Sequence, residues 1–159
     1  CEIKQEVTLA AFSAAKARGC VTILNPAPYQ PLSKELLELT DWIIPNETEF
    51  KELHGHAPSS DDVLRGFRPG KNSIVTLGSE GAVLITSDGK LIRVSAPKVN
   101  AVDTTGAGDA FVGTFAFALA SGKSPEVAMN LGVKVASMSV TRKGAQASYP
   151  SQAEIETLS

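Results

Sequence analysis

Residues 20–44, CVTILNPAPYQPLSKELLELTDWII, decide the fold of this chain. Two apolar runs of strand length, 20–24 and 41–44, enclose a short helical pattern at 33–39. The first run is continuously apolar and β-branched, and the second is apolar after Asp41, which is typical of strands in a parallel sheet covered on both faces. Strand, helix and strand in this order predict a parallel unit of an α/β fold.

The same alternation continues outward from this unit in both directions. Further helices are expected at 7–17, 46–53, between the turn-rich stretches 57–60 and 66–72, from the glycines near 106 to 120, at 125–140 and at 153–158. A third strand is expected at 73–77, and a hairpin at 82–86 and 91–94. The whole chain therefore predicts a three-layer α-β-α fold with a mostly parallel central sheet. Ligands of such sheets bind at the carboxyl ends of the strands.

The composition excludes several classes of function. The 159 residues carry a formal net charge of −2, without the basic excess that nucleic acids or acidic membranes require. Apolar runs are far shorter than the ~20 residues of a membrane span. Cys1 and Cys20 lie far along the chain from His54 and His56, so no zinc site is expected. Reduced thiols and the lack of a secretory signal predict a cytoplasmic protein.

The strongest chemical signal is the stretch 103–113, DTTGAGDAFVG. Gly106, Ala107 and Gly108 have little or no side chain, so an anion can approach the main chain closely. N–H groups at a helix start have no acceptor within the helix, and the helix dipole adds to their attraction for phosphate. Asp109 in the same turn is well placed to take a proton from an alcohol that attacks a γ-phosphate.

These glycines also allow other interpretations. Gly-Ala-Gly-Asp alone is also a common helix start, with no ligand involved. A P-loop is excluded, because Gly122-Lys123-Ser124 has Phe117 where the first glycine should stand. A dinucleotide fingerprint counted from Gly106 has Phe111 at its third glycine position, which makes a dinucleotide-dependent oxidoreductase a weak alternative.

The 103–113 stretch resembles the C-terminal signature of the ribokinase/PfkB family of sugar and nucleoside kinases. Segments 25–28 (NPAP), 45–49 (PNETE) and 140–146 (VTRKGAQ) agree with that family. The resemblance implies a kinase fold that lacks its N-terminal half and lid here. It further implies that Asp109 is the catalytic base on the sugar hydroxyl and that residues 106–109 form the anion hole. Thr114 departs from the family's usual Ala or Gly, which we interpret as a packing change.

The resemblance also implies the nucleotide and magnesium sites. Asn46 and Glu49 match a motif that organises Mg²⁺ and the phosphates, although Asn-x-x-Glu at a helix start is equally a capping box. Glu49 is expected to act on Mg²⁺ indirectly. The expected nucleotide contacts are Asn46, Thr76, Leu77, Gly78, Ser79, Glu80, Gly81, Gly108, Asp109 and Val133. The turn at 76–81 is also explained as a simple strand-to-strand connection.

A monovalent cation, K⁺, is a further expectation from the family. The matching positions are Asp103, Thr105, Ser139, Arg142, Gly144 and Ser148. Arg142 would contribute its backbone carbonyl, because a guanidinium offers no acceptor. The alternative is that 142–144 is an ordinary solvated loop.

Together these features predict that residues 1–159 are the C-terminal nucleotide-binding and catalytic part of one kinase domain. The expected reaction is transfer of the γ-phosphate of ATP to the 5-hydroxyl of D-ribose, with Mg²⁺ and K⁺ as cofactors. Fructokinase, nucleoside kinase and a non-catalytic nucleotide-binding module are the alternatives. The chain begins at Cys1 without a Met, so it is expected to be a piece of a longer protein, poorly active alone. The sequence does not determine the oligomeric state of the complete protein, for which we consider a homodimer.

Overall fold

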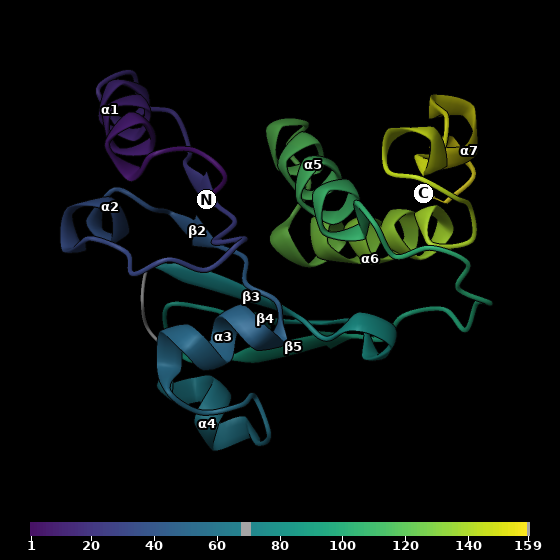
Figure 1. Ribbon diagram of the computed structural model, residues 1–159, viewed down its shortest axis with the longest axis horizontal. Coiled ribbons are helices and arrows are strands. Elements are labelled where there is room, and N and C mark those ends of the chain that lie inside the picture. The colour runs from purple at the N-terminus through teal and green to yellow at the C-terminus, as the bar shows by residue number, and fades with distance from the viewer. Residues whose placement is uncertain (68–70, 159) are drawn as a thin grey trace. The chain divides into compact units, whose positions relative to one another are not determined.

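The computed structural model describes residues 1–67 and 71–158 (Figure 1). The chain divides into two compact units: Cys1–Thr76 with Val83–Ile92, and Leu77–Ala82 with Arg93–Ser159. Within the described ranges, no helix has the length and apolar character that crossing a membrane requires. The expected turn over 66–72 lies partly outside the described residues.

Five strands form one sheet in the order β1-β2-β3-β4-β5. They are β1 (Ile23–Leu24), β2 (Trp42–Ile43), β3 (Asn72–Thr76), β4 (Ala82–Ile85) and β5 (Leu91–Val94). The first three are parallel, with Ile23 opposite Trp42 and Ile43 opposite Ser73. A short turn joins β4 to β5, where the amide of Thr86 donates to the carbonyl of Lys90 (3.0 Å). Strands β4 and β5, at one edge of the sheet, thus form the predicted hairpin.

Strands β1 and β2 are shorter than the runs 20–24 and 41–44, and at their starts a side chain takes one main-chain amide. The Asp41 carboxylate accepts from the amide of Thr22 (3.0 Å), and the Thr22 carbonyl accepts from the amide of Trp42 (3.0 Å). The ammonium groups of Lys16 and Lys71 also donate to Asp41, at 2.7 and 2.8 Å. Asp41 therefore joins the helix before β1 to the starts of β1, β2 and β3.

The helices of the first unit are α1 (Gln5–Lys16), α2 (Lys34–Glu38), α3 (Glu47–His54) and α4 (Asp61–Gly66). Ser33 caps α2, and α3 ends at Gly55 in the left-handed conformation (φ 82°). The core contains the fully buried side chains of Leu36, Ile43 and Phe50. Burial of such side chains contributes about 1.5–3 kcal/mol each relative to exposure.

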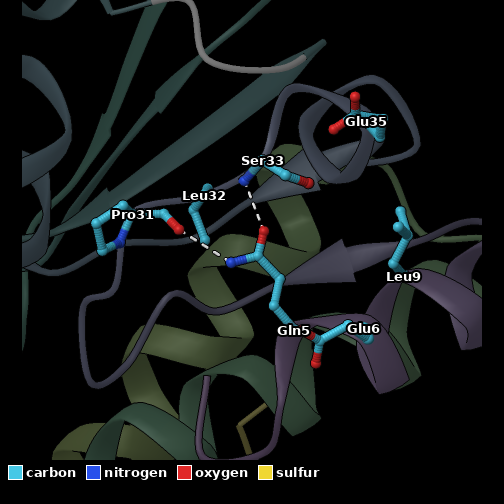
Figure 2. A pocket seen from close by; sticks show the side chains of 7 residues that line it. All are labelled: Gln5, Glu6, Leu9, Pro31, Leu32, Ser33 and Glu35. Atoms are coloured by element: carbon cyan, nitrogen blue, oxygen red, sulfur yellow. Dashed lines mark hydrogen bonds between the residues drawn. The ribbon is translucent and has the colours of Figure 1, made fainter.

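A hollow of about 410 Å³ lies between α1 and α2 (Figure 2). The amide side chain of Gln5 crosses it, donating to the carbonyl of Pro31 (2.9 Å) and accepting from the amide of Ser33 (2.6 Å). None of the predicted site residues lines this hollow. The contacts tie the start of α1 to the start of α2.

The second unit contains α5 (Ala107–Ala120), α6 (Pro125–Ser139), α7 (Gln152–Glu156) and the 3-10 turns η1 (Gly78–Glu80) and η2 (Gln146–Ser148). Helices α5 and α6 pack closely, because Gly132 leaves room for Phe111: an added Cβ would lie 3.0 Å from the ring. Ser124 caps α6, and Pro125 occupies its first turn. The expected helices are therefore present, whereas η1 and η2 were not predicted.

Candidate functional site

The first group of predicted site residues lies where β2 and β3 end. Asn46 pairs with Thr76 in a parallel bridge, and the amide of Thr76 donates to the carbonyl of Pro45 (3.0 Å). Because carboxyl ends of parallel strands meet at one sheet edge, two residues distant in sequence become neighbours. Asn46 and Thr76, both predicted nucleotide contacts, are thus adjacent.

Asn46 and Glu49 form the capping box that the sequence pattern allows. Glu49 Oε2 accepts from the Asn46 amide (2.8 Å), Glu49 Oε1 accepts from Asn46 Nδ2 (2.9 Å), and Asn46 Oδ1 accepts from the Glu49 amide (2.9 Å). Glu49 is only 6% exposed. Each carboxylate oxygen keeps a second lone pair, which can accept a hydrogen bond from a metal-bound water. Glu49 therefore fits the indirect role toward Mg²⁺.

The turn at 77–81 belongs to the second unit and contains η1. The amide of Leu77 donates to the carbonyl of Gly81 (2.8 Å), which closes the turn. Gly81 has φ 103°, and an added Cβ would lie 2.0 Å from the carbonyl oxygen of Val94. This glycine is therefore required by the chain itself, independent of any ligand. Residues 78–80 are exposed, so their main chain is accessible to a nucleotide.

The start of α5 has the geometry of an anion site. Gly106 precedes the helix in the left-handed conformation (φ 79°), and no side chain caps it. In the described part of the chain, the amides of Gly106, Gly108 and Asp109 have no hydrogen-bond acceptor, whereas that of Ala107 donates to the Thr104 carbonyl (3.2 Å). The anion hole predicted at 106–109 thus offers three free amides, and Ala107 contributes its small side chain.

Gly108 and Asp109 are both exposed. A Cβ added at Gly108 would meet nothing within 4 Å, so the space beside this amide is open. Asp109 makes no ion pair with any described residue. A free carboxylate beside unpaired amides, which attract negative charge, can accept a proton from an alcohol bound there.

Asp103 joins the loop before α5 to the loop after α6. Its Oδ1 accepts from the amide of Thr105 (3.0 Å) and its Oδ2 from the amide of Gly144 (2.9 Å). These hydrogen bonds, first that of Gly144 and then that of Thr105, lower the pKa of Asp103 to about 2. The carboxylate is therefore ionised at neutral pH.

The predicted cation ligands around Asp103 have suitable chemistry. The hydroxyl of Ser139 donates to the Ala136 carbonyl (2.9 Å), and that of Ser148 donates to the Ala145 carbonyl (2.6 Å). Since their protons are engaged, both hydroxyl oxygens keep lone pairs for a cation. Carboxylate, hydroxyl and carbonyl oxygens together form a donor set that suits a hard cation. These residues therefore fit a monovalent cation.

Arg142 directs its side chain away from this donor set. Its guanidinium pairs with Glu154 of α7. Glu154 also accepts from the Ser151 amide (2.8 Å) and hydroxyl (2.9 Å), and the Arg142 and Ser151 contacts lower its pKa to about 2. The guanidinium is therefore engaged elsewhere, and the role of the Arg142 backbone carbonyl toward a cation stays a prediction.

Two further residues complete the description of the second unit. Val133 on α6 is only 4% exposed, so little of its surface is left for an adenine ring. Tyr149 was not identified from the sequence: its hydroxyl oxygen would lie 2.9 Å from a Cβ added at Gly106. Tyr149 follows Gly106 by 43 positions in the sequence, and no local pattern predicts that the two are close.

Comparison with known proteins assigns this α/β chain to a family. Residues 1–152 match the model of the pfkB family of carbohydrate kinases. The chain belongs to this family. The resemblance stated from the 103–113 stretch is thereby confirmed.

Curated relatives agree with this assignment. The chain is 38% identical over 164 residues to the ribokinase of Staphylococcus aureus, covering 97% of the chain and 53% of the relative. It is 40% identical over 157 residues to the deoxyribokinase of Salmonella typhi, covering 94% of the chain and 51% of that relative. The chain therefore spans about half the length of these relatives.

Solved structures confirm the predicted fold class. Arabidopsis thaliana ribokinase complexed with ribose and ATP matches with a TM-score of 0.91 at 34% identity, over 99% of the chain and 53% of that structure. Thermotoga maritima ribokinase matches with a TM-score of 0.82 at 38% identity, over 93% of the chain and 52% of that structure. The α/β arrangement of this chain matches about half of each of these two ribokinase structures.

Proposed function

We propose that this chain is the C-terminal nucleotide-binding and catalytic part of an ATP-dependent kinase that phosphorylates D-ribose at O5. One observation carries the proposal: the amides of Gly106, Gly108 and Asp109 are unpaired within the described residues, at a helix start that also presents the free Asp109 carboxylate. Donors fixed in advance around developing negative charge are a large source of catalysis, because they need no reorganisation during the reaction.

In the proposed reaction, the three amides hold the transferred phosphoryl group. Asp109 takes the proton of the sugar 5-hydroxyl while the oxygen of that hydroxyl forms a bond to the γ-phosphorus. The bond from that phosphorus to the β–γ bridging oxygen breaks, and ADP leaves. Mg²⁺ bound with ATP would neutralise phosphate charge, with Glu49 acting through a coordinated water. The turn at 77–81 is the proposed nucleotide contact.

The relatives support ribose as the acceptor. Ribokinases match this chain over nearly its whole length, and the Arabidopsis thaliana ribokinase structure holds ribose and ATP. The deoxyribokinase relative makes 2-deoxy-D-ribose the first alternative, before fructose or a nucleoside. A non-catalytic nucleotide-binding fragment is less favoured, because the free carboxylate of Asp109 has no structural bond to explain it.

A coupled assay of ADP release tests the proposal. The full-length polypeptide that carries this chain is supplied with ATP, Mg²⁺ and, in turn, D-ribose, 2-deoxy-D-ribose, D-fructose and adenosine. We expect the highest kcat/KM with D-ribose and ribose 5-phosphate as product. ADP release with none of the four acceptors would contradict the proposal. The 159-residue chain alone is expected to turn over poorly, because holding both reactants in place supplies much of the rate.

We also propose that K⁺ binds between Asp103 and the loop after α6. One support is the donor set, which consists of oxygens only. The other is the hydrogen bond from the Gly144 amide to Asp103 (2.9 Å), which joins the loop after α6 to the loop before α5. The bound cation would fix the loop that begins the α5 anion site.

The two free thiols accord with a cytoplasmic location, which stays a prediction, as does the homodimer.

A further inference from the structure

The phenol of Tyr149 lies beside the start of α5. Its hydroxyl oxygen would be 2.9 Å from a Cβ added at Gly106, and the Cβ of Ala145 would be 3.1 Å from the same point. Any side chain at residue 106 would therefore occupy the space of this hydroxyl. Gly106 is the residue whose free amide begins the proposed anion hole. A polar side-chain group is thus located next to those amides, within the same structural unit.

The segment that carries Tyr149 is firmly held. The amide of Tyr149 donates to the carbonyl of Gln146 (3.3 Å), and the hydroxyl of Ser148 donates to the carbonyl of Ala145 (2.6 Å). Ser148 and Pro150, its two neighbours in sequence, are buried. The Gly144 amide, bonded to Asp103, anchors the same segment to the loop before α5. The phenol is therefore positioned before any ligand arrives, which lowers the entropic cost of using it.

The hydroxyl of Tyr149 is also chemically available. It makes no hydrogen bond to any described residue. Burial, and secondly the charge of Asp109, raise the pKa of Tyr149 above its ordinary value, so the phenol is neutral at pH 7. A neutral phenol can donate its proton in a hydrogen bond. The Asp109 carboxylate and the Tyr149 phenol are close enough for this electrostatic effect, although they are not hydrogen-bonded.

We infer that the Tyr149 hydroxyl donates a hydrogen bond to the phosphoryl group held by the free amides at the start of α5. Tyr149 is then a further phosphate-binding residue, which contacts the group that moves rather than the rest of the nucleotide. The inference rests on the proposed kinase function. Its physical basis is that an unpaired neutral donor lies beside Gly106, the residue whose free amide begins the proposed anion hole.

Replacing Tyr149 by Phe removes one oxygen and leaves the ring. Isothermal titration calorimetry of the full-length polypeptide, with ATP and with ADP at the same Mg²⁺ concentration, measures the effect. We expect Tyr149→Phe to weaken ATP binding about tenfold, the scale of one hydrogen bond to a charged acceptor at a partly exposed site. ADP binding should be unchanged, because ADP lacks the group that the hydroxyl contacts.

Tyr29→Phe is the matched control, because it removes the same atom from the chain's other tyrosine, which belongs to the first unit. Unchanged ATP affinity in Tyr149→Phe would overturn the inference. Equal weakening of ATP and ADP would also overturn it, since it indicates a merely structural role. Thermal denaturation of both variants checks the fold. If Tyr149→Phe fails to fold, 3-fluorotyrosine at residue 149 must show a ¹⁹F shift with ATP and none with ADP.

The inference and the proposed function fail in different ways. If the unmodified protein does not bind ATP, or phosphorylates no acceptor, the proposed function fails and the role of Tyr149 fails with it. If the protein is an active kinase and blocking Gly108 weakens ATP binding while Tyr149→Phe does not, only the assignment of Tyr149 is wrong.

Discussion

Gly108→Val tests the anion hole with little disturbance of the fold. Gly108 lies in the first turn of α5, is exposed, and has nothing within 4 Å of the position its Cβ would occupy. A valine there adds three carbons to the open side of the helix start, where the phosphate would approach. The protein itself offers no clash, so the effect should fall on the ligand.

The expected magnitudes differ sharply between folding and function. Valine is about 0.3 kcal/mol better than glycine within a helix, so the free energy of unfolding should change by less than about 0.5 kcal/mol. Loss of one anion-hole donor costs about 10²–10³ in kcat. We therefore expect a fall of at least about 10² in kcat/KM, with a nearly unchanged denaturation midpoint.

Gly113→Val is the control for this prediction. Gly113 lies in the same helix, and its added Cβ also meets nothing within 4 Å. ADP release with D-ribose gives kcat/KM, and urea denaturation gives stability, for both variants of the full-length polypeptide. Wild-type kinetics in Gly108→Val would refute the anion-hole assignment. An equal loss of activity in both variants would also refute it, since the effect would then not depend on the helix start.

Three further predictions concern the turn at 77–81, the binding of K⁺ at Asp103, and the stability of the protein in acid. Gly81→Ala should destabilise the protein by more than about 2 kcal/mol in urea denaturation, because its Cβ would lie 2.0 Å from the Val94 carbonyl oxygen in a left-handed backbone (φ 103°); a smaller loss would show that the turn adapts. Replacing tetramethylammonium by K⁺ should raise the thermal midpoint of the protein and not of Asp103→Asn; equal shifts would rule out Asp103 as a ligand. Partial burial opposes ionisation of Asp41, but hydrogen bonds from Lys16 and Lys71 outweigh it, so the pKa of Asp41 lies well below 3.8. The resulting stability is present above pH 3.8 and is lost as pH falls below that value, so Asp41→Asn should be less stable by about 1–3 kcal/mol at pH 7 and by much less near pH 2, as urea titrations at the two pH values would show.

Local signals in the sequence predict most elements of the fold. Asn46 and Glu49 form the capping box that their spacing allows, and Gly55 ends α3 in the left-handed conformation. Strand lengths are harder to predict, because the amide of Thr22 donates to the Asp41 side chain where the apolar pattern alone predicts a main-chain acceptor. Such competition depends on partners about twenty residues away and has no signature in either run.

The candidate site shows the same division between local and distant effects. A glycine-rich helix start predicts free amides at Gly106 and Gly108 from local rules. Only the structure shows that Thr104 occupies the amide of Ala107 and that Tyr149 approaches Gly106. It also shows Gly81 as a packing requirement, whereas the sequence leaves open whether the glycines of the 76–81 turn serve nucleotide access or a simple connection. These contacts depend on how distant segments pack together, so a local sequence pattern cannot predict them.

Asp109→Asn is the most direct test of the central claim, that a free carboxylate beside unpaired amides removes the proton of the sugar hydroxyl. Asparagine keeps the size of the side chain and lacks the basic oxygen pair. In the full-length polypeptide we expect kcat to fall by about 10²–10⁴, the range for loss of a general base, while ATP affinity by calorimetry stays within a few-fold of the original. Retained kcat in Asp109→Asn would contradict the account.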